Sequence, residues 1–380
     1  MGDRKMARIS LKLAHVLNLA NDAYAIVKGL RKNGLDAELI IKSADFGMGL
    51  PMWEDLEIEM DPYNIDFEKL LERYDLPEWI KVWWSTSPNS HLLHSLEVMD
   101  LFKIASEYDF LHCHAPSSMF LQFSGKPFIV HEAGWIRHLI RDDRSVEKLG
   151  RRSYAKARCV VMTNPDTYPM LFRLHYRREE FIPFVIDPNQ YKPQEVDKKE
   201  DLLFFHPARH IWDVKGNQKL ISAFAKFIKE GYTAKLRMVD WGWAEDTSRS
   251  KSLIENLNIG EYIEWVPPYS KPSLIKTYNE SDAVFDQFIL GSGGTACYEA
   301  LSCGKPVVIY LNEWNQKCFG EMPPVENCHS ADQIFRAMVR LTDANHRRDL
   351  GKRGRQFIYR HNHPDVVAKH LIQLYGEVFQ

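Results

Sequence analysis

The sequence lacks several features that would place it in a specialised class. No apolar run approaches the roughly 18 residues that a membrane-spanning helix needs, so helical membrane spans are not expected. No long run carries one sign of charge, and the net charge of −2 gives no electrostatic basis for binding nucleic acid. Internal repeats and low-complexity tracts are also missing. These absences favour a globular protein with no nucleic-acid partner.

Cysteine is not arranged for disulfides or metal. The six cysteines form no CxxC pair, and several lie in apolar runs, where thiols behave as small hydrophobic groups. Such usage fits a reducing cytoplasm. The first eight residues lead towards an expected strand and not into the long apolar core of a signal peptide. We therefore expect a cytoplasmic location.

Alternating strand and helix patterns fill both halves of the 380-residue chain, which is too long for one ordinary core. Buried strands are expected over 11–17, 37–41, 110–114, 128–131, 202–205, 234–239, 263–266, 283–286 and 307–310, whereas 46–103 looks irregular and aromatic. The proline-rich segment 182–193 marks a boundary. The fold class predicted is α/β, with two Rossmann-like doubly wound domains over 1–185 and 186–363.

The most informative stretch is 283–310, which predicts a strand, a glycine loop, a short helix and a second strand. Gly291, Gly293 and Gly294 leave backbone amides bare before a helix that begins at Thr295, and such an arrangement suits an anion. Glu299, about one turn further on, suits a neutral diol. Phosphate at the helix start and ribose one turn along together indicate a nucleotide. A tight turn with close helix–sheet packing is the alternative explanation of the glycines.

The run Gly-x-Gly-Gly-x4-Glu-Ala-Leu-x-Cys-Gly-Lys-Pro-Val-Val resembles the donor-binding signature of family-four retaining glycosyltransferases, which have the GT-B fold. The resemblance implies two lobes that face each other across a cleft, with the final helix, 364–380, packed back on the first. It also implies that Glu299 holds the ribose of a nucleotide-sugar donor. The family's first glutamate would fall at Gly291, so we expect Asp286 or Gln287 to contact the donor sugar instead.

Two cations follow the strand over 202–205. Arg209 and Lys215 lie in a loop at a strand's carboxyl end, where open α/β sheets bind ligands, and they suit a diphosphate. Their spacing of six and the Lys-Gly pair resemble the family's phosphate-binding pair. The donor loop contains no Asp-x-Asp, so we expect no metal and no cofactor beyond the nucleoside-diphosphate sugar itself.

The first domain contributes less specific signals. Asn21 either caps the first helix or presents its amide to the donor phosphates. His131 ends a strand, and the resemblance places it beside the donor sugar; a buried structural histidine is the alternative. His112, His114 and His131 do not predict a metal site, because no carboxylate or thiol shows ligand spacing. Arg137 and His138 are expected near the acceptor.

The aromatic segment contains Trp79, Trp83 and Trp84. We interpret these rings as covering a domain surface; contact with the inner face of a membrane or with a lipid-linked acceptor is the alternative.

The predicted activity is retaining, metal-independent transfer of a sugar, with a hexosyl group favoured, from a nucleoside-diphosphate sugar to an acceptor. The acceptor, a glycan, a lipid or a small molecule, is not indicated by any motif. Two alternatives stay open. A sugar-nucleotide epimerase of similar fold would use His131, and a non-catalytic regulator would bind nucleotide sugar without turnover, because Gly291 replaces a carboxylate.

Overall fold

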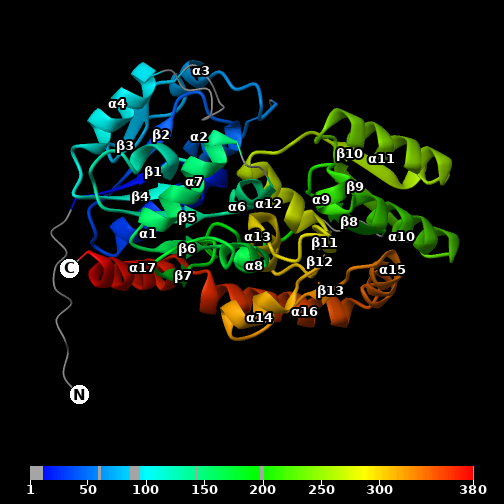
Figure 1. The fold of residues 1–380 in the computed structure, drawn as a ribbon. Helices are drawn as coiled ribbons and strands as arrows, with labels where there is room; N and C mark the ends of the chain where they lie inside the picture. Colours follow the sequence, from blue (N-terminus) through cyan, green and yellow to red (C-terminus); the bar gives the residue numbers. More distant parts are fainter. Residues whose placement is uncertain (1–11, 59–60, 86–94, 142–143, 197–200, 380) are drawn as a thin grey trace.

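The computed structural model describes residues 12–58, 61–85, 95–141, 144–196 and 201–379. They form two parallel sheets, each covered by helices on both faces (Figure 1). We call the sheet formed before residue 182 and its helices the first lobe, and the sheet that begins at Leu202 and its helices the second lobe. This architecture confirms the predicted fold class.

The first sheet has the strand order β3-β2-β1-β4-β5-β6-β7, and every pairing is parallel. Its strands are β1 (Leu13–Val16), β2 (Ala37–Lys42), β3 (Ile80–Trp83), β4 (Phe110–His114), β5 (Phe128–Glu132), β6 (Val160–Met162) and β7 (Glu179–Phe181). Strands β2 and β3 are added on one side of β1, and strands β4 to β7 are added on its other side. Loops after β1, β4 and β5 therefore meet at the switch point where such sheets bind ligands.

The second sheet repeats this arrangement in the order β10-β9-β8-β11-β12-β13, again with parallel pairings. Its strands are β8 (Leu202–His206), β9 (Ala234–Val239), β10 (Ile263–Val266), β11 (Ala283–Phe285), β12 (Val307–Ile309) and β13 (Glu326–Asn327). The switch point lies between β8 and β11. The cationic loop after β8 and the glycine loop after β11 are consequently neighbours.

Helices follow most strands, because apolar positions at helical spacing supply one buried face to each sheet. The first lobe contains α1 (Asp22–Lys32), α2 (Pro51–Asp55), α3 (Phe67–Leu71), α4 (Ser95–Ala105), α5 (Ser118–Leu121), α6 (Ile136–Arg141), α7 (Ser145–Lys156) and α8 (Tyr168–Leu171). The second contains α9 (Trp212–Lys215), α10 (Asn217–Lys229), α11 (Ala244–Asn256), α12 (Lys271–Glu280), α13 (Thr295–Ser302), α14 (Glu313–Phe319), α15 (Ala331–Arg340) and α16 (Ala344–His361).

The final helix, α17 (Pro364–Val378), leaves the second lobe and packs against α1 of the first (Figure 1). Between α16 and α17, the side chain of Asn362 donates to the carbonyl of Phe184, and its carbonyl accepts from the amide of Ile186. The return of the chain is thus joined by hydrogen bonds to the linker between the lobes. Leu371 and Leu374 of α17 belong to the hydrophobic core beneath the first sheet.

Residues 46–103 are more regular than the sequence indicated, since they include the edge strand β3 and helices α2, α3 and α4. The regularity was hidden because these elements are short and their aromatic residues follow no clear period. Trp83 is buried and donates its indole N–H to the carbonyl of Glu97, whereas Trp84 stays 55% exposed. Only one ring of this pair is therefore available at the surface.

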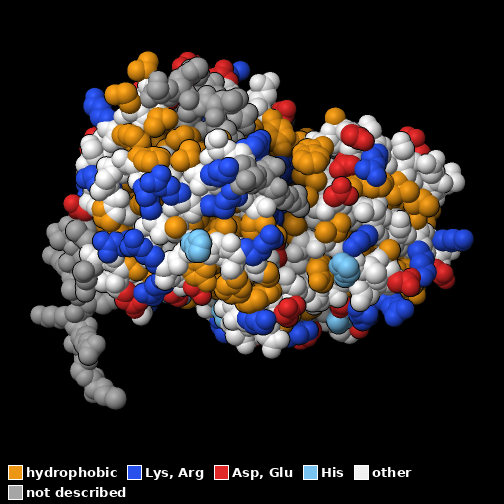
Figure 2. Space-filling model, in the orientation of Figure 1, with side chains coloured by type: hydrophobic (Ala, Val, Ile, Leu, Met, Phe, Trp, Pro, Cys, Tyr) orange, Lys and Arg blue, Asp and Glu red, His pale blue; other side chains and the backbone are white. Residues whose placement is uncertain are grey.

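Apolar and positively charged side chains lie beside each other on one face of the first lobe (Figure 2). Leu96 and Met99 of α4 are among the exposed apolar residues. Among the described residues, no helix is both long enough and apolar enough to cross a bilayer. The expected strand start at residue 11 lies outside the described residues.

Candidate active site

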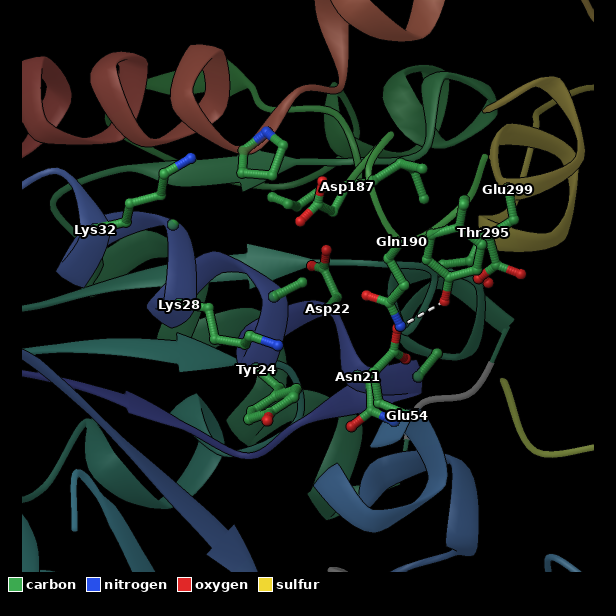
Figure 3. Close-up of a pocket in the computed structure, with 17 residues that line it drawn as sticks. Asn21, Asp22, Tyr24, Lys28, Lys32, Glu54, Asp187, Gln190, Thr295 and Glu299 are labelled. Carbon is green, nitrogen blue, oxygen red and sulfur yellow. Dashed lines mark hydrogen bonds between the residues drawn. The ribbon is translucent and has the colours of Figure 1, made fainter. Parts of the chain in front are cut away.

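A cavity opens between the lobes, where the start of α1 faces the start of α13 (Figure 3). Asn21 and Asp22 line it from the first lobe, and Thr295 and Glu299 line it from the second. The linker adds Asp187 and Gln190. The structure thus brings together predicted donor-binding residues that are separated by more than 270 positions in the chain.

The glycine loop has the local geometry that its sequence requires. Gly291 has φ +85°, and a Cβ there would lie 3.1 Å from the ring of Tyr310 and 3.2 Å from Asn312. A glutamate at this position would therefore be strained, which explains why the expected carboxylate is missing. Gly294 is different, because a Cβ there would meet nothing within 4 Å. Its bare backbone faces open space just before α13 begins at Thr295.

Glu299 is nearly enclosed by the second lobe. Its carboxylate forms an ion pair with the ammonium of Lys271, at the start of α12, and accepts a hydrogen bond of 3.1 Å from the hydroxyl of Tyr278. Burying a carboxylate is costly unless it is paired, and these two partners supply the compensation. Lys271 was not predicted, since no motif surrounds it and its contact with Glu299 depends on the packing of α12 against α13.

Arg209 and Lys215 both follow β8, as predicted. The guanidinium of Arg209 donates to the hydroxyl of Tyr63 at 2.7 Å and lies 5.2 Å from the ring centroid of Trp241. Tyr63 belongs to the first lobe, so this contact bridges the two lobes. Lys215 ends α9, and burial lowers its pKa, whereas the nearby Asp286 carboxylate acts in the opposite direction.

Asp286 and Gln287 were the two candidates for the donor-sugar contact. Burial raises the pKa of Asp286; the charge of Lys215 and a hydrogen bond from the Gly294 amide oppose this rise. Both ends of the Gln287 side-chain amide are hydrogen-bonded within the glycine loop: its oxygen accepts from the Leu290 amide, and its nitrogen donates to the Ser292 carbonyl. Of the two residues, Asp286 is the one whose charge interacts with Lys215 of the predicted phosphate site.

Asn21 does not cap α1 with its side chain. Its side-chain nitrogen donates to the Leu50 carbonyl and its oxygen accepts from Asn18, while Asn18 accepts a hydrogen bond from the Tyr24 amide at 3.0 Å. The capping bond thus comes from Asn18, because Asn21 adopts a left-handed conformation with φ 60° that turns its side chain away. Asn21 remains on the wall of the cavity.

His131 is 1% exposed and lies behind Asp22, so Asp22 and not His131 reaches the cavity wall. Its Nε2 lies 3.1 Å from Asp22 Oδ2 and 2.6 Å from Thr163 Oγ1, and its Nδ1 lies 2.8 Å from His112 Nε2. Asp22, and not His131, is therefore among the residues that line the cavity, and contact of His131 with the sugar stays a prediction. Asp22, which directly follows Asn21, was not predicted, because it belongs to no motif.

Other histidines surround this pair. His15, His112 and His114 are almost completely buried, and burial lowers the pKa of each, with neighbouring histidines adding to the effect. They are therefore neutral rings near pH 7. His112 and His114 share one face of β4, and His15 lies opposite His112 in the register of β1 and β4.

Arg137 and His138 were both expected near the acceptor, but their environments differ. Arg137 forms an ion pair with Asp166: its Nη2 lies 2.8 Å from Oδ1, and its Nε lies 3.2 Å from Oδ2. Its charge also contributes to lowering the pKa of Lys215, which places it close to the cationic loop of the other lobe. His138 is exposed on α6.

Comparison with known proteins identifies the second lobe. Residues 187–357 match the family model Glycosyl transferases group 1. The second lobe belongs to this family. The chain is accordingly a glycosyltransferase, and the resemblance seen in the glycine-loop motif is confirmed. No curated protein matches the chain in sequence.

Solved structures share the fold of this glycosyltransferase over nearly its whole length. Sucrose-phosphate synthase from Thermosynechococcus elongatus matches with a TM-score of 0.69 at 16% identity, covering 97% of this chain and 99% of the other. HepE from Anabaena, solved with UDP-glucose, matches with a TM-score of 0.70 at 14% identity, and the match covers 97% of this chain and 100% of HepE. A glycosyltransferase from Rickettsia africae matches with a TM-score of 0.67 at 14% identity, and the match covers 98% of this chain and 99% of the other. These matches establish the GT-B fold of both lobes.

Proposed function

We propose that the glycosyltransferase transfers a hexosyl group from a nucleoside-diphosphate sugar to an acceptor with retention of anomeric configuration. The observation that carries this proposal is the position of Thr295 and Glu299 on one wall of the cavity, opposite Asn21 and Asp22. In this proposal the domain over residues 186–363, which contains the second lobe, binds the donor, and the domain over residues 1–185, which contains the first lobe, receives the acceptor. A uridine base is favoured, because HepE, which shares the fold, was solved with UDP and with UDP-glucose.

The donor would lie along the glycine loop. The ribose hydroxyls contact Glu299, and the diphosphate lies against the backbone of Gly293, Gly294 and Thr295 at the start of α13. Arg209 and Lys215 approach the same diphosphate from the loop after β8. Arginine offers a planar fork of donors and lysine a point charge, so together they suit two phosphate groups. This assignment requires no metal ion at the diphosphate.

The reaction breaks the bond between the anomeric carbon and the diphosphate oxygen and forms a bond from that carbon to the acceptor oxygen. Negative charge develops on the departing diphosphate, and preorganised cations that stabilise it lower the barrier most. Arg209 and Lys215 have this role. The acceptor approaches on the face that the diphosphate leaves, and a diphosphate oxygen takes the acceptor proton. Asp286, beside Lys215, is proposed to hold a hydroxyl of the donor sugar.

His131 has a positioning role in this account. It contacts Asp22 at 3.1 Å, and Asp22 forms part of the cavity wall, so His131 acts on the cavity through Asp22. This arrangement gives little support to an epimerase that uses His131 directly on the sugar. A non-catalytic regulator would keep the nucleotide site and lack turnover.

A two-step experiment tests the proposal. Thermal shifts measured with UDP, GDP, ADP and their sugars should reveal one base that stabilises the chain, and acceptors are then screened with that donor. Formation of an α- or β-linked product with the donor's own anomeric configuration supports retaining transfer. Stabilisation without turnover across the screen would favour the regulator, and an altered sugar nucleotide formed without acceptor would favour the epimerase.

A further inference from the structure

Three side chains of the first lobe converge behind the cavity wall, where the proposed transfer reaction uses Asp22 and His131 only for positioning. Asp22 begins α1, His114 ends β4, and His131 lies near the end of β5. Each offers one ligand atom, and the three atoms lie within 4.8 Å of one another. All three side chains are at least 98% buried. Neighbouring parallel strands bring them together at the carboxyl edge of the first sheet, where ligands bind in such folds.

Two of these side chains have atoms that nothing satisfies. Among the described residues, no group makes a well-aligned hydrogen bond to either oxygen of Asp22 or to Nδ1 of His114. His131 Nε2 lies 3.1 Å from Oδ2 of Asp22. Buried polar atoms are normally bonded, and an uncompensated carboxylate is especially unfavourable. The unpaired oxygens and nitrogen therefore have the chemistry of cation ligands.

We propose that Asp22, His114 and His131 bind a divalent transition-metal ion of the zinc class. Zinc takes histidine nitrogen and carboxylate oxygen at about 2.0–2.2 Å, which makes the edge of a tetrahedral site roughly 3.4 Å long. The 3.1 Å between His131 Nε2 and Asp22 Oδ2 is close to that edge. The ion neutralises Asp22 and joins α1 to β4 and β5. Its ligands are distinct from Arg209 and Lys215, so the ion does not replace them at the diphosphate.

The surrounding hydrogen bonds fit this assignment, because metal-bound histidines usually donate their other N–H to a partner. His114 Nε2 lies 3.1 Å from His15 Nδ1, and His131 Nδ1 lies 2.8 Å from His112 Nε2. Both outer histidines reach the hydroxyl of Tyr375 on α17, at 3.1 Å from His15 Nε2 and 2.7 Å from His112 Nδ1.

Counting protons shows that the set is chemically consistent. If each neutral imidazole donates outwards, both chains of hydrogen bonds end as donors to the Tyr375 oxygen, which has two lone pairs. His114 Nδ1 then has a free lone pair for the metal. The lone pair of His131 Nε2 faces Asp22 and the Thr163 hydroxyl, 2.6 Å away, whose hydrogen bond the metal would replace. The alternative set of His15, His112 and His114 is less suitable, because two of its histidines, His15 and His112, would each have to give up a partner, whereas in the proposed set only His131 does so.

Metal content measured on the whole chain tests this proposal without any activity assay. Protein stripped with a chelator should take up one zinc ion per chain and melt at a higher temperature with zinc. Asp22→Asn should weaken zinc binding by about 100-fold or more, because it removes an anionic ligand. His361→Gln, which changes a histidine of α16 that bonds Glu321, should bind zinc as the wild type does.

Anomalous diffraction from zinc-soaked wild-type crystals makes the test independent of how the variants fold. The proposal predicts a zinc peak enclosed by Asp22, His114 and His131. It is overturned if stripped wild-type protein takes up no zinc at micromolar concentration, if the peak lies elsewhere, or if folded Asp22→Asn protein binds zinc as tightly as the wild type. A peak among His15, His112 and His114 would also overturn it.

Discussion

The ammonium of Lys271 pairs with the carboxylate of Glu299 in a site where the two side chains are only 11% and 2% exposed. The pair lies between α12 and α13, and the hydroxyl of Tyr278 provides a second contact to the carboxylate. Lys271 therefore neutralises and orients the residue that we assign to the ribose. The donor site depends on a contact between two helices as much as on the glycine motif.

Breaking this ion pair should cost stability. Lys271→Met leaves a buried carboxylate without its counter-ion, and the free energy of unfolding is expected to fall by about 3 kcal/mol. Urea denaturation measures this change. The double variant Lys271→Met/Glu299→Gln removes both charges and should recover most of the loss. Lys276→Met, an exposed lysine on the same helix, is the control and should change stability little. Equal destabilisation by the single and double variants would contradict the assigned pairing.

Removal of either loop cation should slow transfer strongly. Arg209→Ala or Lys215→Ala removes one charge-assisted contact to the leaving diphosphate, and kcat/KM is expected to fall about 10²-fold or more. Initial rates of product formation with the donor found in the thermal-shift panel provide the measurement. Lys226→Ala removes an exposed lysine paired with Asp332 and should retain full activity. A loss below about threefold for Arg209→Ala or Lys215→Ala would contradict their role.

Two glycines of the loop should respond differently to substitution. Gly291→Glu introduces the carboxylate that the family motif contains, but φ +85° and the neighbouring Tyr310 and Asn312 oppose it. It should lower the free energy of unfolding by about 1–3 kcal/mol and should not raise activity. Gly294→Ala meets no neighbouring atom, so it should fold normally while its methyl group weakens nucleotide binding. Normal nucleotide affinity in Gly294→Ala would argue against phosphate at this loop. Both effects are measured by thermal unfolding with and without the nucleotide.

Stability should decrease in mild acid because of buried histidines. Burial lowers the pKa of His206 to about 3 and that of His210 to about 4. The unfolded chain takes up these protons near pH 6.5, whereas the folded chain resists them, so stability is lost as pH falls from 6.5 towards 4. The expected loss is about 2 kcal/mol per histidine between pH 7 and 5.

Urea denaturation at several pH values tests this loss. The variant His206→Gln should show a smaller decrease of the free energy of unfolding between pH 7 and 5. In the folded protein Asn217 donates to His206 Nε2, and the Phe285 carbonyl lies 2.6 Å from Nδ1, which matches a neutral ring with its proton on Nδ1. A wild-type stability that does not change between pH 7 and 5 would contradict the burial argument. If His206→Gln lost as much stability between pH 7 and 5 as the wild type, His206 would not contribute to the loss.

Sequence periodicity was sufficient to predict the lobes and the loops that carry Arg209, Lys215 and Glu299. Arg209 and Lys215 lie in the segment after β8, and Glu299 lies in the helix that follows the glycine loop after β11, so their place at the sheet edge follows from local pattern. Tyr63 was beyond such reasoning, since it meets Arg209 across 146 positions and two lobes. Asp22 and His114 likewise come together only when β1 and β4 pair. A histidine pattern without its distant carboxylate gave no reason to expect a metal.

The most direct test of the donor-site account is a crystal structure of the chain with UDP. The account predicts the diphosphate beside Arg209, Lys215 and the amides at the start of α13, with the ribose hydroxyls on Glu299. Nucleotide density anywhere else in the molecule would contradict it.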